Sequence, residues 1–540
     1  MIDLRGKSGL LIDDIPEMRS ALRIQLADAG LEKCDMARTI KEAIERISTN
    51  RYDLIVSDYN LGQGADGQQL LELVRRKQVL PMTTAFMMIT GETGYEQVST
   101  AAEYSPDDYL IKPFTAETLR SRLERVLERK AALKPLFQQL GAKGDKNLAL
   151  EACATLITTQ PRYLTDILRI RGQLLMDLGQ TEQALALYDM VLSQRATPWA
   201  EVGKASALAA QGNSDKAQGQ LQHALETYPN YLAAYDTLAQ LVEKTDKVAA
   251  QAIVEQALKV APSTQRQRRL GGLAMENKDF ARAEIAFKRA VEKDRTGFFK
   301  EHGDYAGLAK SCSEQGKFAE AMTAIKGMGQ HFANSPELSA RQAAVESQVL
   351  AKAGKTTEAK AALERALAVH GQSPLDPEAA LEIASACFAN GDSARAKNII
   401  QAVAEDHQEN GGILAAAHAV FHAAGLGDEG TAFLETTRKN MIRLNNEAVG
   451  LARSGELEQA ITMLQAAADR LTNNAQVAIN AALAILMDIQ RNGMKRDRLN
   501  KAHAYLLQAH RANPTHARLP EVAKLYRTLA PADAAPLQIG

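Results

Sequence analysis

The chain has 540 residues with a formal net charge of −1, and 24% of its residues are charged. This length exceeds what one hydrophobic core normally organises, so we expect two or more domains. The balanced charge gives no electrostatic reason to expect nucleic acid or an anionic membrane as the main partner. The four cysteines lie far apart without a CxxC spacing, which indicates core residues of a protein in a reducing cytosol.

Further features favour a cytoplasmic protein without a membrane span. The amino terminus lacks the apolar core of a signal peptide, because Asp13 interrupts its first apolar run. The most apolar later stretch, residues 413–426, is too short to cross a bilayer and carries His418 and His422. The sequence shows no Walker loop, dinucleotide fingerprint or DNA-binding helix-turn-helix pattern.

Four short apolar runs near the amino terminus predict strands of a parallel sheet that is buried on both faces. They are Leu10–Ile12, Leu54–Val56, Phe86–Ile89 and Tyr109–Ile111. Helical patterns alternate with them at residues 16–29, 39–48, 67–77, 95–104 and 115–130. This alternation predicts a doubly wound α/β domain.

Each of these runs is followed by side chains that can take part in chemistry. Asp13 and Asp14 follow the first run, Asp58 the second, Thr90 the third and Lys112 the fourth. Ligands of open α/β sheets bind at the carboxyl ends of the strands. Three carboxylates crowded at that edge repel one another and need a hard divalent cation, and ligation by oxygen alone suits Mg²⁺.

Taken singly, each of these features has an ordinary structural explanation. An Asp-Asp pair before Pro16 is more often a helix N-cap, and a Thr-Gly or Lys-Pro pair is usually a turn. Their occurrence in order on successive predicted strand ends favours one common site.

Over residues 7–130, the order and spacing of these residues resemble the receiver domain of two-component response regulators. The resemblance implies a flavodoxin-like fold with a five-stranded parallel sheet. It implies that Asp58 is the phosphoacceptor, and that Asp13, Asp14 and Asp58 hold Mg²⁺ together with the backbone carbonyl of Asn60. It further implies the switch hydroxyl, the switch aromatic, the active-site lysine and a proline with a cis peptide bond, at Thr90, Tyr109, Lys112 and Pro113 respectively.

One departure from the family pattern lies in the loop after the phosphoacceptor. Gly62 stands where the family usually has proline, and Asp66-Gly67 arrive about one residue late. We therefore expect a longer, looser loop over Gly62–Ala65, with consequences for the lifetime of a phosphoryl group and the fit of a donor kinase.

Beyond Pro135, alanine and leucine dominate, and a pattern of small and large residues recurs about every 33 residues. Two of its copies are Gly179, Ala184 and Tyr188, followed by Gly212, Ala217 and Leu221. Small residues allow helices to cross closely, and a glycine between helices ends the first one. The pattern predicts stacked helix pairs.

From residue 134 to 515, these repeats resemble a tetratricopeptide-repeat (TPR) array of about nine or ten helix pairs. We expect a receiver at residues 1–130, an all-α superhelical solenoid at 131–530 and a frayed tail at 531–540. Residues 406–440 fit the repeat poorly and predict a degenerate helix pair with longer turns. The resemblance implies that the array binds an unidentified protein or peptide.

Together these resemblances predict a response regulator, not an enzyme beyond the receiver's own phosphorylation and dephosphorylation. Its partners would be a cognate histidine kinase or phosphotransfer protein and the TPR ligand, with the receiver docking on the first repeats or on a second receiver in a homodimer. Alternatives remain: a phosphate sink or a constitutive scaffold indifferent to phosphorylation, and an RNA-associated regulator using the basic run Arg266–Arg269.

Overall fold

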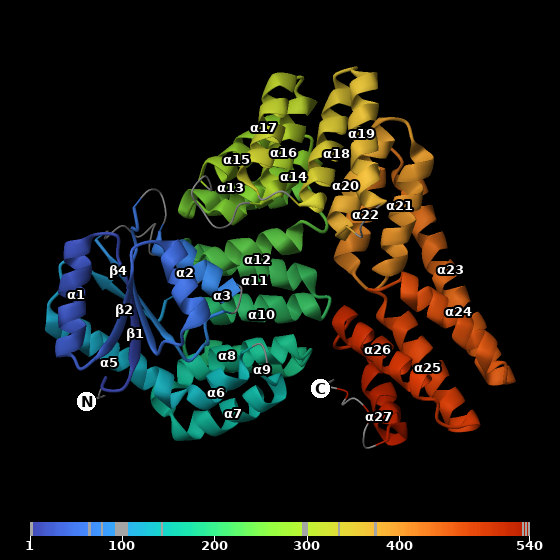
Figure 1. Ribbon diagram of the computed structural model, residues 1–540. Helices are drawn as coiled ribbons and strands as arrows, with labels where there is room; N and C mark the ends of the chain where they lie inside the picture. The colour runs from blue at the N-terminus through green and yellow to red at the C-terminus, as the bar shows by residue number, and fades with distance from the viewer. Residues whose placement is uncertain are drawn as a thin grey trace. The chain divides into compact units, whose positions relative to one another are not determined.

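The computed structural model describes residues 4–62, 66–76, 79–91, 106–141, 144–293, 301–332, 335–371, 375–531, 534 and 537. The chain forms two compact units, Met1–Gln315 and Gly316–Gly540. The first unit contains a five-stranded sheet and the helices that follow it, whereas every described element of the second unit is a helix (Figure 1).

The sheet is entirely parallel with strand order β2-β1-β3-β4-β5. Its strands and helices are β1 (Ser8–Ile12), α1 (Pro16–Asp28), β2 (Lys33–Ala37), α2 (Ile40–Thr49), β3 (Leu54–Asp58), α3 (Gly67–Arg76), β4 (Ala85–Thr90), β5 (Asp108–Ile111) and α5 (Ala116–Ala132). One face of the sheet packs on α1 and α5, and the other packs on α2 and α3. The predicted doubly wound fold is therefore confirmed.

The four predicted strands are confirmed, but β2 was not located by the hydrophobic pattern. It lies at the edge of the sheet, where Cys34, Asp35 and Met36 are only partly buried. A strand that buries so little apolar surface has no continuous apolar run to reveal it. The helix predicted at residues 95–104 lies outside the described residues.

Helix α5 leads almost directly into the repeats. It ends at Ala132, Leu133 caps it, and α6 (Lys134–Gln139) starts immediately with Pro135 in its first turn. Proline fits this position because the first turn of a helix has no need of its missing N–H group. Leu133 and Leu136 are fully buried, so this joint is packed rather than a solvated linker.

Helices make up the rest of the described part of the first unit. They are α7 (Lys146–Thr159), the 3₁₀ turn η1 (Pro161–Tyr163), α8 (Leu164–Asp177), α9 (Thr181–Gln194), α10 (Pro198–Ala210), α11 (Ser214–Thr227), α12 (Leu232–Val242), α13 (Lys247–Val260), α14 (Thr264–Glu276), α15 (Phe280–Lys293) and α16 (His302–Glu314).

The second unit continues this pattern with longer helices near its end. Its helices are α17 (Phe318–His331), α18 (Pro336–Lys352), α19 (Thr356–His370), α20 (Pro377–Ala389), α21 (Ser393–Asp406), α22 (Gly411–Ala423), α23 (Gly427–Ser454), α24 (Leu457–Arg470), α25 (Ala475–Asn492), α26 (Arg496–Ala512) and α27 (Leu519–Leu529). No helix among the described residues has both the length and the apolarity needed to cross a membrane.

Glycines end the first helix of many pairs, as the repeat pattern predicts. Gly179, for example, has φ of 71°, and the next residue, Gln180, donates its N–H to the Leu175 carbonyl at 2.8 Å. Side chains with a Cβ rarely adopt this left-handed conformation. In the α14–α15 pair, Lys278 takes the turn position with φ of 60°.

Other glycines lie inside helices, where they make room for an aromatic ring from the next helix. The Phe287 ring of α15 packs against Gly271 of α14 and Gly307 of α16. A Cβ on Gly271 would lie 2.7 Å from the Phe287 ring, whereas a Cβ on the neighbouring Gly272 would meet nothing within 4 Å. Glycine at position 271 is therefore a packing requirement.

Helix α23 departs from the repeat pattern. It is 28 residues long and takes the place of two repeat helices and the turn between them. The prediction of longer turns within residues 406–440 is wrong, because Gly425 (φ 76°) makes a tight turn before α23. No glycine or proline occurs between Gly430 and Gly450, so nothing in the sequence ends the helix there.

The predicted tail at residues 531–540 lies largely outside the described residues. Leu537, which is described, is 8% exposed and belongs to the core cluster formed by α23 to α27.

We expect Gly271→Ala to destabilise the protein, because overpacking typically costs about 1–3 kcal/mol. The matched control is Gly272→Ala on the same helix, which should stabilise it by up to about 1 kcal/mol through helix propensity alone. Urea denaturation of the full chain, followed by helical circular dichroism, measures both effects. Equal midpoints for the two variants would contradict the packing role of Gly271.

Candidate functional site

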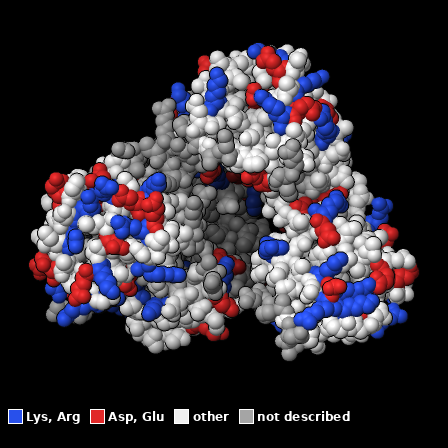
Figure 2. All heavy atoms as spheres, in the orientation of Figure 1, with Lys and Arg blue, Asp and Glu red and all other residues white. Residues whose placement is uncertain are grey.

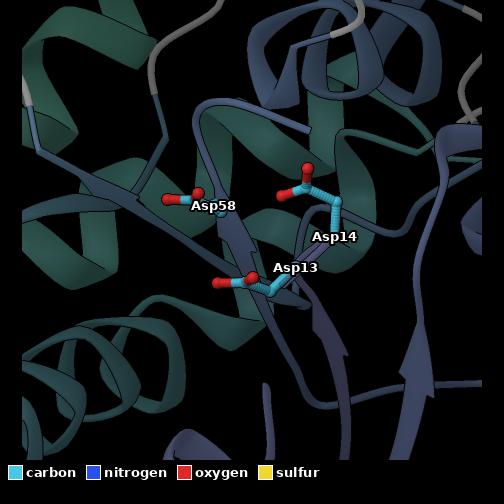
Figure 3. A group of neighbouring side chains, drawn as sticks. All are labelled: Asp13, Asp14 and Asp58. Atoms are coloured by element: carbon cyan, nitrogen blue, oxygen red, sulfur yellow. The ribbon is translucent and has the colours of Figure 1, made fainter. Parts of the chain in front are cut away.

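Three carboxylates meet at the carboxyl ends of β1 and β3 (Figure 3). Each of Asp13, Asp14 and Asp58 offers an oxygen within 4.8 Å of an oxygen of the other two. The strands place them there because β1 and β3 are neighbours, with Ile12 opposite Ser57. Asp13 is fully buried, Asp58 is 7% exposed, and Asp14 is half-buried.

The two oxygens of Asp13 have different surroundings. Oδ1 accepts a hydrogen bond from the Ile15 backbone N–H at 2.8 Å. Oδ2 is buried and has no hydrogen bond to any described residue, and the Lys112 Nζ atom lies 3.8 Å away. Leaving a buried polar atom unsatisfied costs free energy, so this oxygen is prepared for a cation.

Lys112 brings a positive charge to the carboxylates. Its Nζ donates a hydrogen bond to Asp58 Oδ1 at 2.9 Å. Its backbone N–H donates to the Thr90 carbonyl at 2.7 Å, which holds the residue beside the end of β4. The Lys112–Pro113 peptide bond is cis, as the family resemblance implies.

Burial raises the pKa of both Asp13 and Asp58 above the ordinary aspartate value. The hydrogen bond from the Ile15 N–H opposes this for Asp13, and the hydrogen bond from Lys112 opposes it for Asp58. Asp14 adds repulsion that raises the pKa of both. The fold therefore makes the ionised forms of Asp13 and Asp58 less stable than they are in water.

The remaining predicted residues lie at the same end of the sheet or close to it. Thr90 is the last residue of β4 and is 4% exposed. Tyr109, within β5, has a buried hydroxyl without a hydrogen-bond partner in the described structure, and burial raises the pKa of Tyr109. Asn60 lies two residues beyond Asp58, and its side-chain Oδ1 accepts a hydrogen bond from the Gly62 N–H at 3.1 Å.

The structure gives a physical reason for the glycines after Asp58. Gly62 has φ of 69°, which proline cannot adopt, and a Cβ there would lie 2.6 Å from Asp14 Oδ2. A Cβ on Gly67 would lie 2.3 Å from the Asp58 carbonyl oxygen. At both positions, only glycine lets the backbone lie this close to the acidic pocket. Residues 63–65 of the predicted long loop lie outside the described residues.

The pocket fits a hard divalent cation. Its ligand atoms are carboxylate oxygens, one of which is buried and has no hydrogen bond among the described residues, and Lys112 is paired with two of the three acids, Asp13 and Asp58. Magnesium prefers oxygen ligands of this kind and keeps some of its water. Within the described part of the chain, no other group of three His, Cys, Asp or Glu side chains is close enough to share a metal ion.

His418 and the basic run at residues 266–269 have structural explanations. His418 shares a 2.8 Å hydrogen bond with Thr431. In the basic run, Arg266 pairs with Asp236, Arg268 with Asp304 and Glu301, and Arg269 with Glu243. Acids of neighbouring elements thus neutralise the run, which argues against a basic patch for RNA.

Residues 10–124 match the family described as response regulator receiver domain. The chemotaxis protein CheY-3 of Vibrio cholerae is 32% identical over 120 residues, covering 22% of this chain and 91% of that protein. The chain belongs to the response regulator receiver family. CheY of Pseudomonas aeruginosa is 31% identical over a receiver segment that covers 22% of this chain and 95% of that protein.

Residues 241–297 and 345–406 match the tetratricopeptide-repeat family. The receiver also aligns with the solved structure of Vibrio cholerae CheY4, at 30% identity and a TM-score of 0.21, covering 22% of this chain and 98% of that one. A tetratricopeptide repeat protein from Parabacteroides merdae aligns at 17% identity and a TM-score of 0.30, covering 44% of this chain and 92% of that one. The family match at residues 241–297 and 345–406 shows that TPR repeats follow the receiver.

We expect Mg²⁺ to stabilise the receiver, by about 2.7 kcal/mol at a concentration 100 times its dissociation constant. Asp13→Asn should stabilise the metal-free protein, because it removes a buried charge while keeping an acceptor for the Ile15 N–H. It should also abolish the gain from Mg²⁺. Differential scanning calorimetry of the full chain measures both, with the surface variant Asp28→Asn as control. A normal Mg²⁺ gain in Asp13→Asn would refute this assignment.

Proposed function

We propose that this chain is a response regulator whose Asp58 accepts a phosphoryl group from the phosphohistidine of a histidine kinase or phosphotransfer protein. The observation that carries the proposal is the 2.9 Å hydrogen bond from Lys112 to Asp58 inside a pocket of three carboxylates. The nucleophile, its neighbouring acids and a cation thus lie together at the carboxyl edge of a parallel sheet.

In the transfer step, a carboxylate oxygen of Asp58 forms a bond to phosphorus while the donor's phosphorus–nitrogen bond breaks. The histidine nitrogen keeps the electron pair and is protonated by solvent. Lys112 is close enough to hold the phosphoryl oxygens once they arrive, because its Nζ already lies against Asp58 Oδ1. A Mg²⁺ ion held by Asp13, Asp14, Asp58 and the Asn60 carbonyl would supply further neutralisation of phosphoryl charge.

The phosphoryl group adds a charge of about −1.5 to −2 at neutral pH. This charge can stabilise a second conformation of the receiver. We assign Thr90 as the hydroxyl that bonds a phosphoryl oxygen and Tyr109 as the aromatic residue that responds. The Tyr109 hydroxyl is buried and has no hydrogen-bond partner among the described residues, which supports this role because such a group can gain a hydrogen bond by moving.

We assign the output to protein binding by the TPR repeats. Stacked helix pairs offer extended surfaces for peptides or partner helices. On the face shown in Figure 2, acidic and basic side chains are interspersed over the receiver, without a continuous basic strip. The charge on this face of the receiver therefore gives no reason to assign a nucleic acid as its partner.

Asp58→Asn should abolish phosphorylation, because an amide cannot form the acyl phosphate. The wild type, incubated with Mg²⁺ and acetyl phosphate, should gain one phosphoryl group by intact mass spectrometry, and Asp28→Asn should match it. Lys112→Ala should slow the reaction by at least about tenfold, because it removes the ammonium that stabilises the phosphoryl oxygens in the transition state. Undiminished labelling of Asp58→Asn would show that another residue is the acceptor.

If phosphorylation gates partner binding, affinity capture with the full chain in Mg²⁺ and beryllofluoride should retain a protein that Asp58→Ala does not, or the reverse. Beryllofluoride imitates the phosphoryl group on Asp58, so the two samples differ only in the state of the receiver. Identical captured proteins would refute gating and favour a constitutive scaffold or a phosphate sink.

A further inference from the structure

Strand β5 is only four residues long, and it has charged residues of opposite sign at its two ends. Lys112 follows β5 and reaches into the acidic pocket. Asp107 precedes β5, at the amino-terminal ends of β4 and β5. Its Oδ2 accepts a hydrogen bond from the Phe86 N–H of β4 at 2.9 Å, and its backbone N–H donates to the Phe86 carbonyl at 2.7 Å. Asp107 is thus joined to β5 through the chain and to β4 through two hydrogen bonds.

Asp107 is the centre of an ionic cluster that joins β5 to helices α3 and α5. Its Oδ1 pairs with Arg129 at 2.8 Å and with Lys130 at 2.9 Å, and its Oδ2 lies 3.8 Å from Arg75. The next residue, Asp108, pairs with Arg122 at 3.0 Å and Arg125 at 2.7 Å. One side of α5 is thus held along the start of β5.

Lys130 differs from the arginines of α5 in its burial and in its further contacts. Its side chain is 5% exposed, compared with 28% for Arg129, 41% for Arg122 and 57% for Arg125. Burial lowers the pKa of Lys130 to about 8, against the opposing effect of Asp107. A buried ammonium has little access to water and is held by the protein groups around it.

Two of those groups connect Lys130 to the first repeat. Its Nζ donates a hydrogen bond to the Met82 carbonyl at 2.7 Å and lies 4.8 Å from the centre of the Phe137 ring in α6. Phe137 is 8% exposed, and Met82 packs against the same core cluster, which includes Ala149 and Cys153 of α7. One ammonium therefore contacts the start of β5, the loop before β4 and the first helix after the receiver.

We propose that Lys130 is a positioning residue that transmits a displacement of β5 to the first repeat helices. This inference rests on the proposed function, since phosphorylation of Asp58 is what would displace β5. When Asp107 moves, Lys130 keeps its ion pair only by shifting against Met82 and Phe137. Its burial offers no water to replace either contact, so α6 and α7 repack.

Hydrogen exchange on the full chain, with and without Mg²⁺ and beryllofluoride, tests this transmission. Peptides covering residues 54–62 report ligand binding at the receiver, and peptides covering residues 133–159 report α6 and α7. In the wild type, both sets should change. In Lys130→Met, the change at residues 54–62 should persist while the change at 133–159 falls by about fivefold or more, within the usual range of coupling between sites.

The matched control is Arg120→Met, which removes one positive charge from an exposed Arg120–Glu124 pair on the same helix and should respond as the wild type does. Lys130→Met leaves Asp107 paired with Arg129 and Arg75, so the carboxylate still has partners of opposite charge. If that variant nevertheless unfolds, Phe137→Leu replaces it, because leucine keeps an apolar contact and removes the ring beneath the ammonium. It should reduce the response at residues 133–159.

Two results would overturn the inference. One is a full response at residues 133–159 in the Lys130 or Phe137 variant. The other is a wild type in which residues 54–62 respond and residues 133–159 do not. A wild type in which residues 54–62 fail to respond would instead refute the proposed function, so the two failures are distinguishable.

Discussion

The mutual repulsion of three carboxylates in one partly buried space is the constraint on which the receiver depends. Asp13, Asp14 and Asp58 are brought together by the pairing of β1 with β3, so the fold of the sheet itself creates the repulsion. Lys112 relieves part of it through contacts of 2.9 and 3.8 Å. The remaining negative charge favours a divalent cation and makes the pocket sensitive to any group that changes its charge.

A pocket with this balance suits a switch because a phosphoryl group alters the charge at one fixed point. Moving an equilibrium from about 1% to about 99% requires about 5.5 kcal/mol of differential stabilisation. The short strand β5 is well placed to use such energy, since Lys112 and Asp107 flank it. Lys112, after β5, contacts the acidic pocket, and Asp107, before β5, is the centre of the ionic cluster that includes Lys130.

Much of this site could be predicted from the sequence because its residues directly follow buried apolar strands. Asp13, Asp58, Thr90 and Lys112 were found in this way, and the structure brings Asp13, Asp58 and Lys112 into contact. Strand β2 could not be located, because an edge strand buries too little apolar surface. Asp107 and Lys130 were missed because their contacts join residues far apart in the chain, such as Lys130 and Met82, and no local pattern records them.

The repeats show a related limit of sequence reasoning. The spacing of glycine and alanine predicted the turns at Gly179 and Gly212, because one residue decides the backbone conformation there. The 28-residue helix α23 forms instead because no glycine or proline interrupts it between Gly430 and Gly450. A search for repeated residues does not detect such an absence.

Because each repeat contacts mainly its neighbours, a disturbance introduced at α6 has to pass from one helix pair to the next. Under the proposed function, each interface that repacks would take up part of the free energy that phosphorylation supplies. The surface most responsive to the receiver should therefore lie on the helices that follow α6 most closely in the chain, α7 to α9, rather than on the distant repeats. The packed joint at Leu133 and Leu136 favours this arrangement, because a flexible linker would have dissipated the displacement before the first repeat.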